Sequence, residues 1–241
     1  MPGQTEVLSL LHLLRPYQCD FRKVRIGSLG DGGYVMPDDC DGVTAVLSLG
    51  VGTEVSFDEH FAKRGVPVYQ YDPTVGGPPV AHENFHFNAV AWGATDSPGV
   101  ASLGTMIRSH GLNATNDAIL KFDIEGGEWD AMSTVAPDQL KYFRIIVCEL
   151  HALHAIHDLT YLRTLKRTMN LLTRNHTVVH LHANNCCGIT LVEGVPVPAV
   201  VELTLLRNDR SGFAPSDEPI PGPLDYPSMD DRPDLVLRPF G

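Results

Sequence analysis

The sequence predicts an α/β protein with a mostly parallel sheet of seven strands, helices on both faces and an antiparallel last strand. Its short apolar runs, such as residues 44–49 and 118–122, are continuous, as in strands that are buried on both faces. These runs alternate along the chain with segments of helical periodicity, which favours a parallel sheet. A chain of 241 residues, 43% of them hydrophobic, can bury a sizeable core. We therefore expect one domain over residues 1–241.

The expected elements follow this alternation in order. Leucines at helical spacing predict a helix over residues 4–15, and the glycine-rich loop "RIGSLGDGGYVMPDD" completes an N-terminal part over residues 1–40. The core over residues 41–208 is expected to contain strands at 44–49, 67–71, 85–91, 118–122, 144–149 and 177–181, helices at 56–64, before Leu112 and at 156–174, and a last strand in "VPVPAVVELTLLRN" with the hairpin partner "GITLVEG". Residues 209–241, rich in Pro and Asp, predict an arm.

Charge and composition limit the kinds of binding partner, the cellular location and the state of the cysteines. A net charge of -11 argues against nucleic acid and against an anionic membrane surface, because both attract basic patches. No apolar run is long enough to span a bilayer and the N-terminus lacks a basic signal segment, so we expect a cytoplasmic protein. The five cysteines are an odd number, and the adjacent Cys186 and Cys187 lack the spacing of a zinc site. We expect free thiols.

Glycines and an acid at the ends of the first two core strands indicate an adenosine site, because ligands of open α/β sheets bind at the carboxyl ends of strands. Gly50 and Gly52 allow close approach of a ligand, and Ser56 opens the next helix. Asp72 follows the second strand, where an acid accepts hydrogen bonds from ribose hydroxyls. A turn and a helix cap are the alternative. Val55 replaces the third glycine of a dinucleotide fingerprint, which favours S-adenosylmethionine.

Several motifs then follow in a familiar order and spacing. They are "AVLSLGVGTEVSFD", "YQYDPT", "FNAVAWGATD", "ASLGTMI", "ILKFDIEGGEWDAM" and "RIIVCEL". Over about residues 40–150 they resemble the FkbM-like class of S-adenosylmethionine-dependent O-methyltransferases, which implies a Rossmann-like class I methyltransferase fold. The resemblance implies that Gly50 and Gly52 face the methionine part of the cofactor and that Asp72 holds its ribose. It further implies that Ala89, Val90 and Trp92 lie along the adenine, and we also expect cofactor contacts at Asp123 and Tyr34.

Two positions qualify this resemblance. Ser48 stands where such methyltransferases usually carry an acidic residue. For Trp92 the alternative is a place in the core, because a large aromatic side chain is mostly buried in either case.

Carboxylates follow two neighbouring strands of the expected sheet. Asp123 follows the fourth strand and Glu149 the fifth, so their side chains should lie side by side. Two anions so close favour a cation between them, and oxygen ligands suit Mg²⁺ or a similar divalent ion. Such an ion, with a nearby base, promotes loss of the proton from an acceptor hydroxyl. Glu128 is a further catalytic candidate, although it could instead cap the following helix.

Histidines near these carboxylates supply candidates for the base. His151 lies two residues beyond Glu149 and is the first candidate, because imidazole titrates near neutral pH, and His154 is the second. His182 is expected to bind the metal or the substrate, with Asn184 and Asn185 as hydrogen-bond partners. An ordinary polar role in a crowded loop is the alternative for each histidine.

Together these features predict an O-methyltransferase that acts on a hydroxyl of a small saccharide with the help of a metal. The likeness to small bacterial sugar methyltransferases narrows the acceptor to a mannoside of methylated polysaccharide biosynthesis. Two other classes stay open: a metal-dependent hydrolase with an Asp, Glu and His site, and a non-catalytic adenosine-binding module. The N-terminal helix and the arm could also join two copies into a homodimer.

Overall fold

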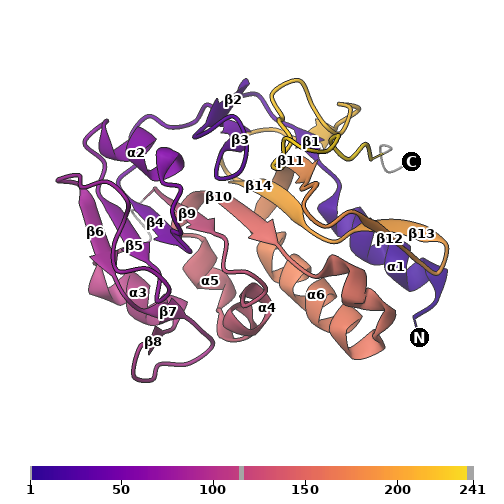
Figure 1. The fold of residues 1–241 in the computed structure, drawn as a ribbon, viewed down its shortest axis with the longest axis horizontal. Helices are drawn as coiled ribbons and strands as arrows, with labels where there is room; N and C mark the ends of the chain where they lie inside the picture. The colour runs from indigo at the N-terminus through magenta and orange to yellow at the C-terminus, as the bar shows by residue number, and fades with distance from the viewer. Residues whose placement is uncertain (1, 114–116, 238–241) are drawn as a thin grey trace.

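A seven-stranded sheet runs through the centre of the protein, as predicted (Figure 1). The computed structural model describes residues 2–113 and 117–237, so residues 238–241 of the predicted arm lie outside the described residues. The strands, in spatial order, are β6 (Phe85–Asn88), β5 (Val68–Tyr71), β4 (Val46–Leu49), β9 (Ala118–Phe122), β10 (Phe143–Leu150), β14 (Val201–Arg207) and β11 (His176–Ala183). Only β14 runs antiparallel to its neighbours in this sheet. The fold is a Rossmann-like α/β fold.

Helices cover most of one face of the sheet, because alternate strand residues such as Leu47 and Leu120 point toward them. These elements are α1 (Gln4–Leu11), η1 (His12–Leu14), α3 (Leu103–Ser109), α4 (Glu128–Ala131), η2 (Met132–Thr134), α5 (Pro137–Leu140), η3 (Leu153–His157) and α6 (Leu159–Leu172). The other face receives Val46 and Ile145 and is covered by α2 (Ser56–Ala62) and by a hairpin of β2 (Lys23–Ile26) and β3 (Tyr34–Pro37). Helices therefore lie on both faces, as predicted, but a hairpin replaces part of one helical layer.

Several predicted boundaries change for local reasons. The predicted helix at 156–174 is divided into η3 and α6, because Asp158 accepts a hydrogen bond from the backbone N–H of Tyr161 at 2.8 Å and starts a new helix. The predicted strand at 85–91 ends at Asn88, and β7 (Ala91–Trp92) pairs with β8 (Val100–Ala101) instead. The predicted last strand is two strands, β13 (Val195–Pro198) and β14. The expected hairpin partner is β12 (Ile189–Val192), which pairs with β13.

The C-terminal arm folds back over the sheet. Its first strand, β15 (Ala214–Pro215), pairs with β1 (Tyr17–Gln18), and the rest crosses the carboxyl end of β11 (Figure 1). Buried ion pairs fasten it there, as described below. Within the described ranges, no helix is long and apolar enough to cross a membrane.

Candidate functional site

Strand order reverses in the middle of the sheet, between β4 and β9. The chain leaves β4 for β5 on one side and later returns to β9 on the other, and such a switch point leaves a crevice at the carboxyl ends of the strands. Gly50 follows β4 there with φ of 78°, and a Cβ atom at Gly50 would lie 1.6 Å from the main-chain oxygen of Asp123. Only glycine fits this contact. The loop predicted to hold a cofactor therefore touches the segment that carries the predicted metal acid.

Asp72 occupies the predicted ribose position but is already bonded to its own chain. Its Oδ2 accepts hydrogen bonds from the N–H groups of Val51 and Gly52, both at 2.9 Å, and its Oδ1 accepts two from Thr74, at 2.7 and 2.6 Å. Burial opposes ionisation, but the bonds from Gly52 and Thr74 prevail and lower the pKa of this carboxyl below its usual value. Because a carboxylate has about four acceptor positions, a ribose would have to displace some of these bonds.

The other predicted cofactor contacts differ in their exposure. Ala89 is exposed and Val90 half-buried, while Trp92 is buried, with its ring 5.2 Å from that of Phe122. Trp92 Nε1 and Ser56 Oγ are buried without a hydrogen-bond partner among the described residues. The Trp92 ring therefore has the core position that was the alternative to a cofactor contact.

Lys121 links the glycine loop to a buried acid that the sequence did not lead us to expect. Lys121 is 6% exposed, and its ammonium group donates to the carbonyl of Gly50. Ser48 is its register partner on β4 and carries no charge. The buried Asp58 on α2 lies near enough to feel this cation: burial raises the pKa of Asp58, and Lys121 opposes the shift. Position 48 carries a serine where the methyltransferases that the sequence resembles usually have an acidic residue. In this protein Asp58 is the acidic residue that interacts with Lys121.

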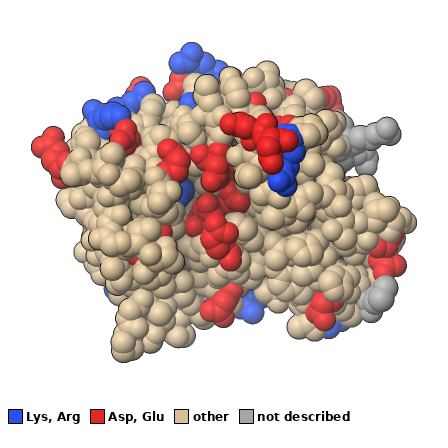
Figure 2. Space-filling model, viewed as in Figure 1, with Lys and Arg blue, Asp and Glu red and all other residues tan. Residues whose placement is uncertain are grey.

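Four carboxylates surround His151. Its Nε2 lies 3.8 Å from Asp123, 3.4 Å from Glu125 and 3.4 Å from Glu149, and its Nδ1 lies 3.1 Å from Glu128. Asp123 and Glu149 were predicted to meet at the ends of neighbouring strands, and His151 now lies between them. Figure 2 shows acidic side chains in a band down the middle of this face, over the region of β9 and β10 in Figure 1.

This environment shifts the pKa values of His151, Glu149 and Asp123. Burial alone would lower the pKa of His151, but Glu128 and Glu149 raise it to about 11. Burial raises the pKa of Glu149 to about 7, with Asp123 adding to the rise and His151 opposing it. Burial also raises the pKa of Asp123. At neutral pH His151 is therefore an imidazolium that balances negative charge, and it is not ready to accept a proton.

The same cluster has the donors that a divalent cation requires. One ligand atom from each of Asp123, Glu125 and His151 lies within 4.8 Å of the others. Asp123 Oδ1 is buried without a hydrogen-bond partner in the described part of the chain, so it has an acceptor to offer. Carboxylate oxygen and imidazole nitrogen together suit Mg²⁺, Mn²⁺ or Zn²⁺. The residues present therefore fit a metal.

The remaining predicted residues lie elsewhere. The side chain of His154 is exposed on η3. His182 is fully buried on β11 and contacts Glu202 at 3.1 Å and Asp234 of the arm at 3.0 Å. Burial lowers the pKa of His182, but these acidic partners outweigh burial and raise it to about 9. The metal group found among the described residues contains Glu125 and His151 in place of the predicted Glu149 and His182.

The arm also covers the asparagines predicted to bind substrate. Asn185 Nδ2 donates to the carbonyls of Met229 and Arg232, at 2.9 and 3.1 Å. On the same strand, His180 Nε2 lies 2.8 Å from the carboxylate of Asp225. Only Asn184 keeps a link to the predicted site, through a hydrogen bond of 3.1 Å from its Nδ2 to Glu149. No local pattern pointed to Glu202, Asp225 or Asp234, because their partners are distant in sequence.

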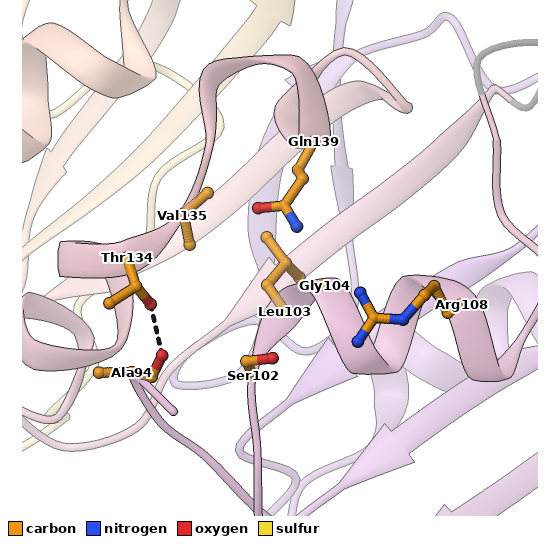
Figure 3. Close-up of a pocket in the computed structure, with 8 residues that line it drawn as sticks. All are labelled: Ala94, Ser102, Leu103, Gly104, Arg108, Thr134, Val135 and Gln139. Carbon is orange, nitrogen blue, oxygen red and sulfur yellow. Dashed lines mark hydrogen bonds between the residues drawn. The ribbon is translucent and has the colours of Figure 1, made fainter. Parts of the chain in front are cut away.

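A separate small pocket lies away from this site. It has a volume of about 180 Å³ and is shown in Figure 3 between α3 and the segment from Thr134 to Gln139. Gln139 and Arg108 line it, and its wall includes none of the predicted site residues. We assign it no role.

Comparisons with known proteins add no family. No family model matches the chain, and no curated protein matches it. The likeness to FkbM-like methyltransferases stays a prediction that depends on the motifs quoted above.

Proposed function

We propose that the protein is an S-adenosylmethionine-dependent O-methyltransferase that modifies a hydroxyl of a small neutral saccharide with the help of a divalent cation. The observation that supports it best is the contact between the main chains of Gly50 and Asp123. Through this contact, a glycine loop suited to a nucleoside cofactor and a carboxylate suited to a metal share one edge of the sheet. Methyl transfer needs a donor and an activated acceptor within van der Waals reach of each other.

Each group of residues has its own task in this proposal. Gly50 and Gly52 would admit the methionine part of the cofactor, which supplies the methyl group. Asp123, Glu125 and His151 would hold the cation, which when bound lowers the pKa of an acceptor hydroxyl. Glu149, whose pKa of about 7 lies near neutrality, is placed to accept the released proton, and it replaces His151 as our first candidate for the base.

The chemistry around the site suits an uncharged polyol. Acidic side chains form a band down the middle of the face in Figure 2, and they would repel phosphate or carboxylate substrates. Carboxylate oxygens accept hydrogen bonds from sugar hydroxyls. A mannoside stays our narrower choice because of the resemblance alone. A cytoplasmic location and a homodimer also stay predictions.

A metal-dependent hydrolase is the second candidate, and one observation favours it. The four hydrogen bonds of Asp72 to its own chain give the glycine loop a structural reason to exist without any cofactor. The Asp, Glu and His cluster would then activate water in place of a hydroxyl. A non-catalytic adenosine-binding module would need the loop but not the cluster.

Isothermal titration of S-adenosylhomocysteine and then of Mg²⁺ into the full chain tests the proposal. Thr74→Val removes one bond to Asp72 Oδ1 and leaves the side-chain volume unchanged, so it should retain or improve nucleoside binding, whereas Asp72→Ala should abolish it. Asp123→Asn should lose mainly the metal. Asp130→Asn, at an exposed acid on the next helix, is the matched control.

The outcomes separate the candidates. Binding of both ligands, followed by methylation of a neutral sugar in a screen, would support the methyltransferase. A folded protein that binds Mg²⁺ but no S-adenosylhomocysteine would reject it in favour of the hydrolase. Binding of S-adenosylhomocysteine without binding of Mg²⁺ and without methylation of any sugar would leave the non-catalytic binding module.

A further inference from the structure

Two adjacent cysteines lie in the turn that follows β11. Cys186 is half-buried and Cys187 is exposed, and their Sγ atoms are 2.9 Å apart. Both are free thiols, as are the other cysteines of the chain. A pair of thiols this close, with one open to solvent, can react as a unit with a small oxidant.

This turn is connected by hydrogen bonds to the carboxylate cluster. The backbone N–H of Cys186 donates to Asn184 Oδ1 at 2.9 Å, and Asn184 Nδ2 donates to Glu149 Oε1 at 3.1 Å. Asn184 is 3% exposed, so water does not readily replace either bond. The orientation of Glu149 therefore depends on where the main chain of Cys186 lies.

The arm is fastened to the same turn. Arg232 donates from Nη1 to the carbonyl of Cys186 at 3.0 Å, and Asn185 binds the backbone of Met229. A movement of the Cys186 backbone would therefore change two sets of hydrogen bonds: those that lead through Asn184 to Glu149, and the one to Arg232 of the arm.

We propose that Cys186 and Cys187 form a reversible thiol switch: oxidation by a peroxide joins them in a disulfide, moves the Cys186 N–H and releases Asn184 from Glu149. The formation of the disulfide stands on the cysteine pair alone. Its effect on metal affinity rests on the proposed function, because it requires that the cluster bind a cation.

The reaction balances with hydrogen peroxide as the oxidant. The exposed Cys187 thiolate attacks one peroxide oxygen, which gives a sulfenic acid and a hydroxide that takes a proton to become water. The sulfur of Cys186 then attacks the sulfenic sulfur, an S–S bond forms, and a second water leaves with the thiol proton. The two thiols lose two electrons and two protons, and the peroxide is reduced. Burial and Cys187 raise the pKa of Cys186 to about 12, which leaves the first attack to Cys187.

Geometry explains why oxidation would move the backbone. Consecutive Cα atoms are about 3.8 Å apart across a trans peptide, whereas unstrained disulfides join Cα atoms roughly 4.4–6.8 Å apart. A disulfide between neighbours must therefore distort the turn, and strained, exposed disulfides are easily reduced again. The distortion of the turn and the ease of reduction are expected of a reversible regulatory disulfide and not of a permanent structural one.

The experiment treats the reduced full chain with hydrogen peroxide and measures three quantities: free thiols in denaturant, peptide masses without reduction, and Mn²⁺ affinity by titration. We expect the thiol count to fall from five to three, with a disulfide mapped between Cys186 and Cys187 and reversed by dithiothreitol. Mn²⁺ affinity should fall by about 10-fold, because Glu149 lies 3.4 Å from Nε2 of the proposed ligand His151 and helps to orient that ring.

Two variants act as controls. Cys187→Ser should keep its Mn²⁺ affinity with or without peroxide, because it cannot form the bond. Asn184→Ala should show the weak affinity of the oxidised protein even when fully reduced, because it lacks the connection to Glu149.

Contrary outcomes are distinct. An unchanged thiol count, or oxidation at other cysteines, would overturn the switch, as would a mapped disulfide that leaves Mn²⁺ affinity unchanged. If the reduced protein binds no Mn²⁺, the metal part of the proposed function fails, and the switch is judged by amide hydrogen exchange instead. Oxidation should then speed exchange at the Cys186 N–H, and unaltered exchange would reject it.

Discussion

The buried carboxylate of Glu128 accepts two hydrogen bonds from His151, one from its backbone N–H at 2.6 Å and one from its ring Nδ1 at 3.1 Å. Its other oxygen accepts the N–H of Gly126 at 2.9 Å. Glu128 was predicted as a catalytic residue, but its side chain is fully buried and faces away from solvent. It acts as a positioning residue that holds the ring so that Nε2 faces Asp123, Glu125 and Glu149.

Glu128→Gln should therefore weaken both stability and metal binding. The change removes a charged acceptor that serves three donors, and a hydrogen bond to a charged group contributes about 1.5–3 kcal/mol. We expect the free energy of unfolding in urea to fall by about 2 kcal/mol, together with weaker Mn²⁺ binding. Asp130→Asn, an exposed neighbour on α4, is the control. A variant as stable as the wild type would show that Glu128 does not hold His151.

Metal binding should release protons at neutral pH. The pKa of His151 is about 11 and that of Glu149 about 7, so His151 is protonated and Glu149 partly protonated before a cation competes for the same carboxylates. The heat of Mn²⁺ binding at pH 7.5 should therefore vary with the ionisation enthalpy of the buffer. His151→Asn should reduce that variation. Equal heats in phosphate-free buffers of different enthalpy would contradict the prediction.

His176 should make the protein sensitive to mild acid. It is 1% exposed, its Nε2 donates to the carbonyl of Phe143 at 2.8 Å, and burial lowers its pKa from 6.5 to about 4. Because the unfolded chain binds the proton more readily, stability is full above pH 6.5 and is lost as the pH falls toward 4. The loss should reach about 3 kcal/mol.

Urea unfolding of the wild type and of His176→Gln at pH 7 and pH 4.5 measures this contribution. Gln can keep the donor to Phe143 but does not titrate, so the variant should lose less stability between the two pH values. His157→Gln, at an exposed histidine, should behave like the wild type. The same pH dependence in all three proteins would disprove the assignment.

Arg144 should be required for folding. It is 3% exposed on β10, donates to the carbonyls of Asp39 and Asp41 at 3.1 and 2.6 Å, and pairs with the carboxylate of Asp117 at 2.8 Å. Arg144→Met removes the donor to these two carbonyls and leaves Asp117 with Arg207 and Arg210 as its partners, which should cost about 3 kcal/mol.

Thermal and urea unfolding of Arg144→Met should show that loss directly. Lys141→Met removes an exposed cation whose pair with Asp138 lies at the surface, and it should change stability by less than about 0.5 kcal/mol. Similar stabilities for the two variants would mean that the Arg144 network is not a structural ion pair.

The sheet was predictable because its strands are continuous apolar runs. The meeting of Asp123 and Glu149 was predictable for a related reason, since residues that end neighbouring parallel strands share an edge. The free thiols and the arm also followed from composition. Each of these inferences depends on residue type and sequence pattern alone.

The rest of the site depends on contacts between distant segments. Glu128 looked like a helix cap or a catalytic acid, and nothing local showed that a four-residue helix would turn it toward His151. His182 looked free to bind a metal because its partner Asp234 lies 52 residues later. Asp72 matched a ribose position, whereas the main chain of the glycine loop occupies its oxygens.

The antiparallel strand β14 has a consequence for how the chain matures on the ribosome. β11 pairs only with β14 in the sheet, and one edge of β10 is also completed only by β14. During synthesis, one edge of β10 therefore stays unpaired until residue 207 has left the ribosome. Until then β11 has no partner strand in the sheet. Because such edges attract other chains, the stretch from β10 to β14 is where a nascent or truncated copy is most exposed to aggregation and to chaperones.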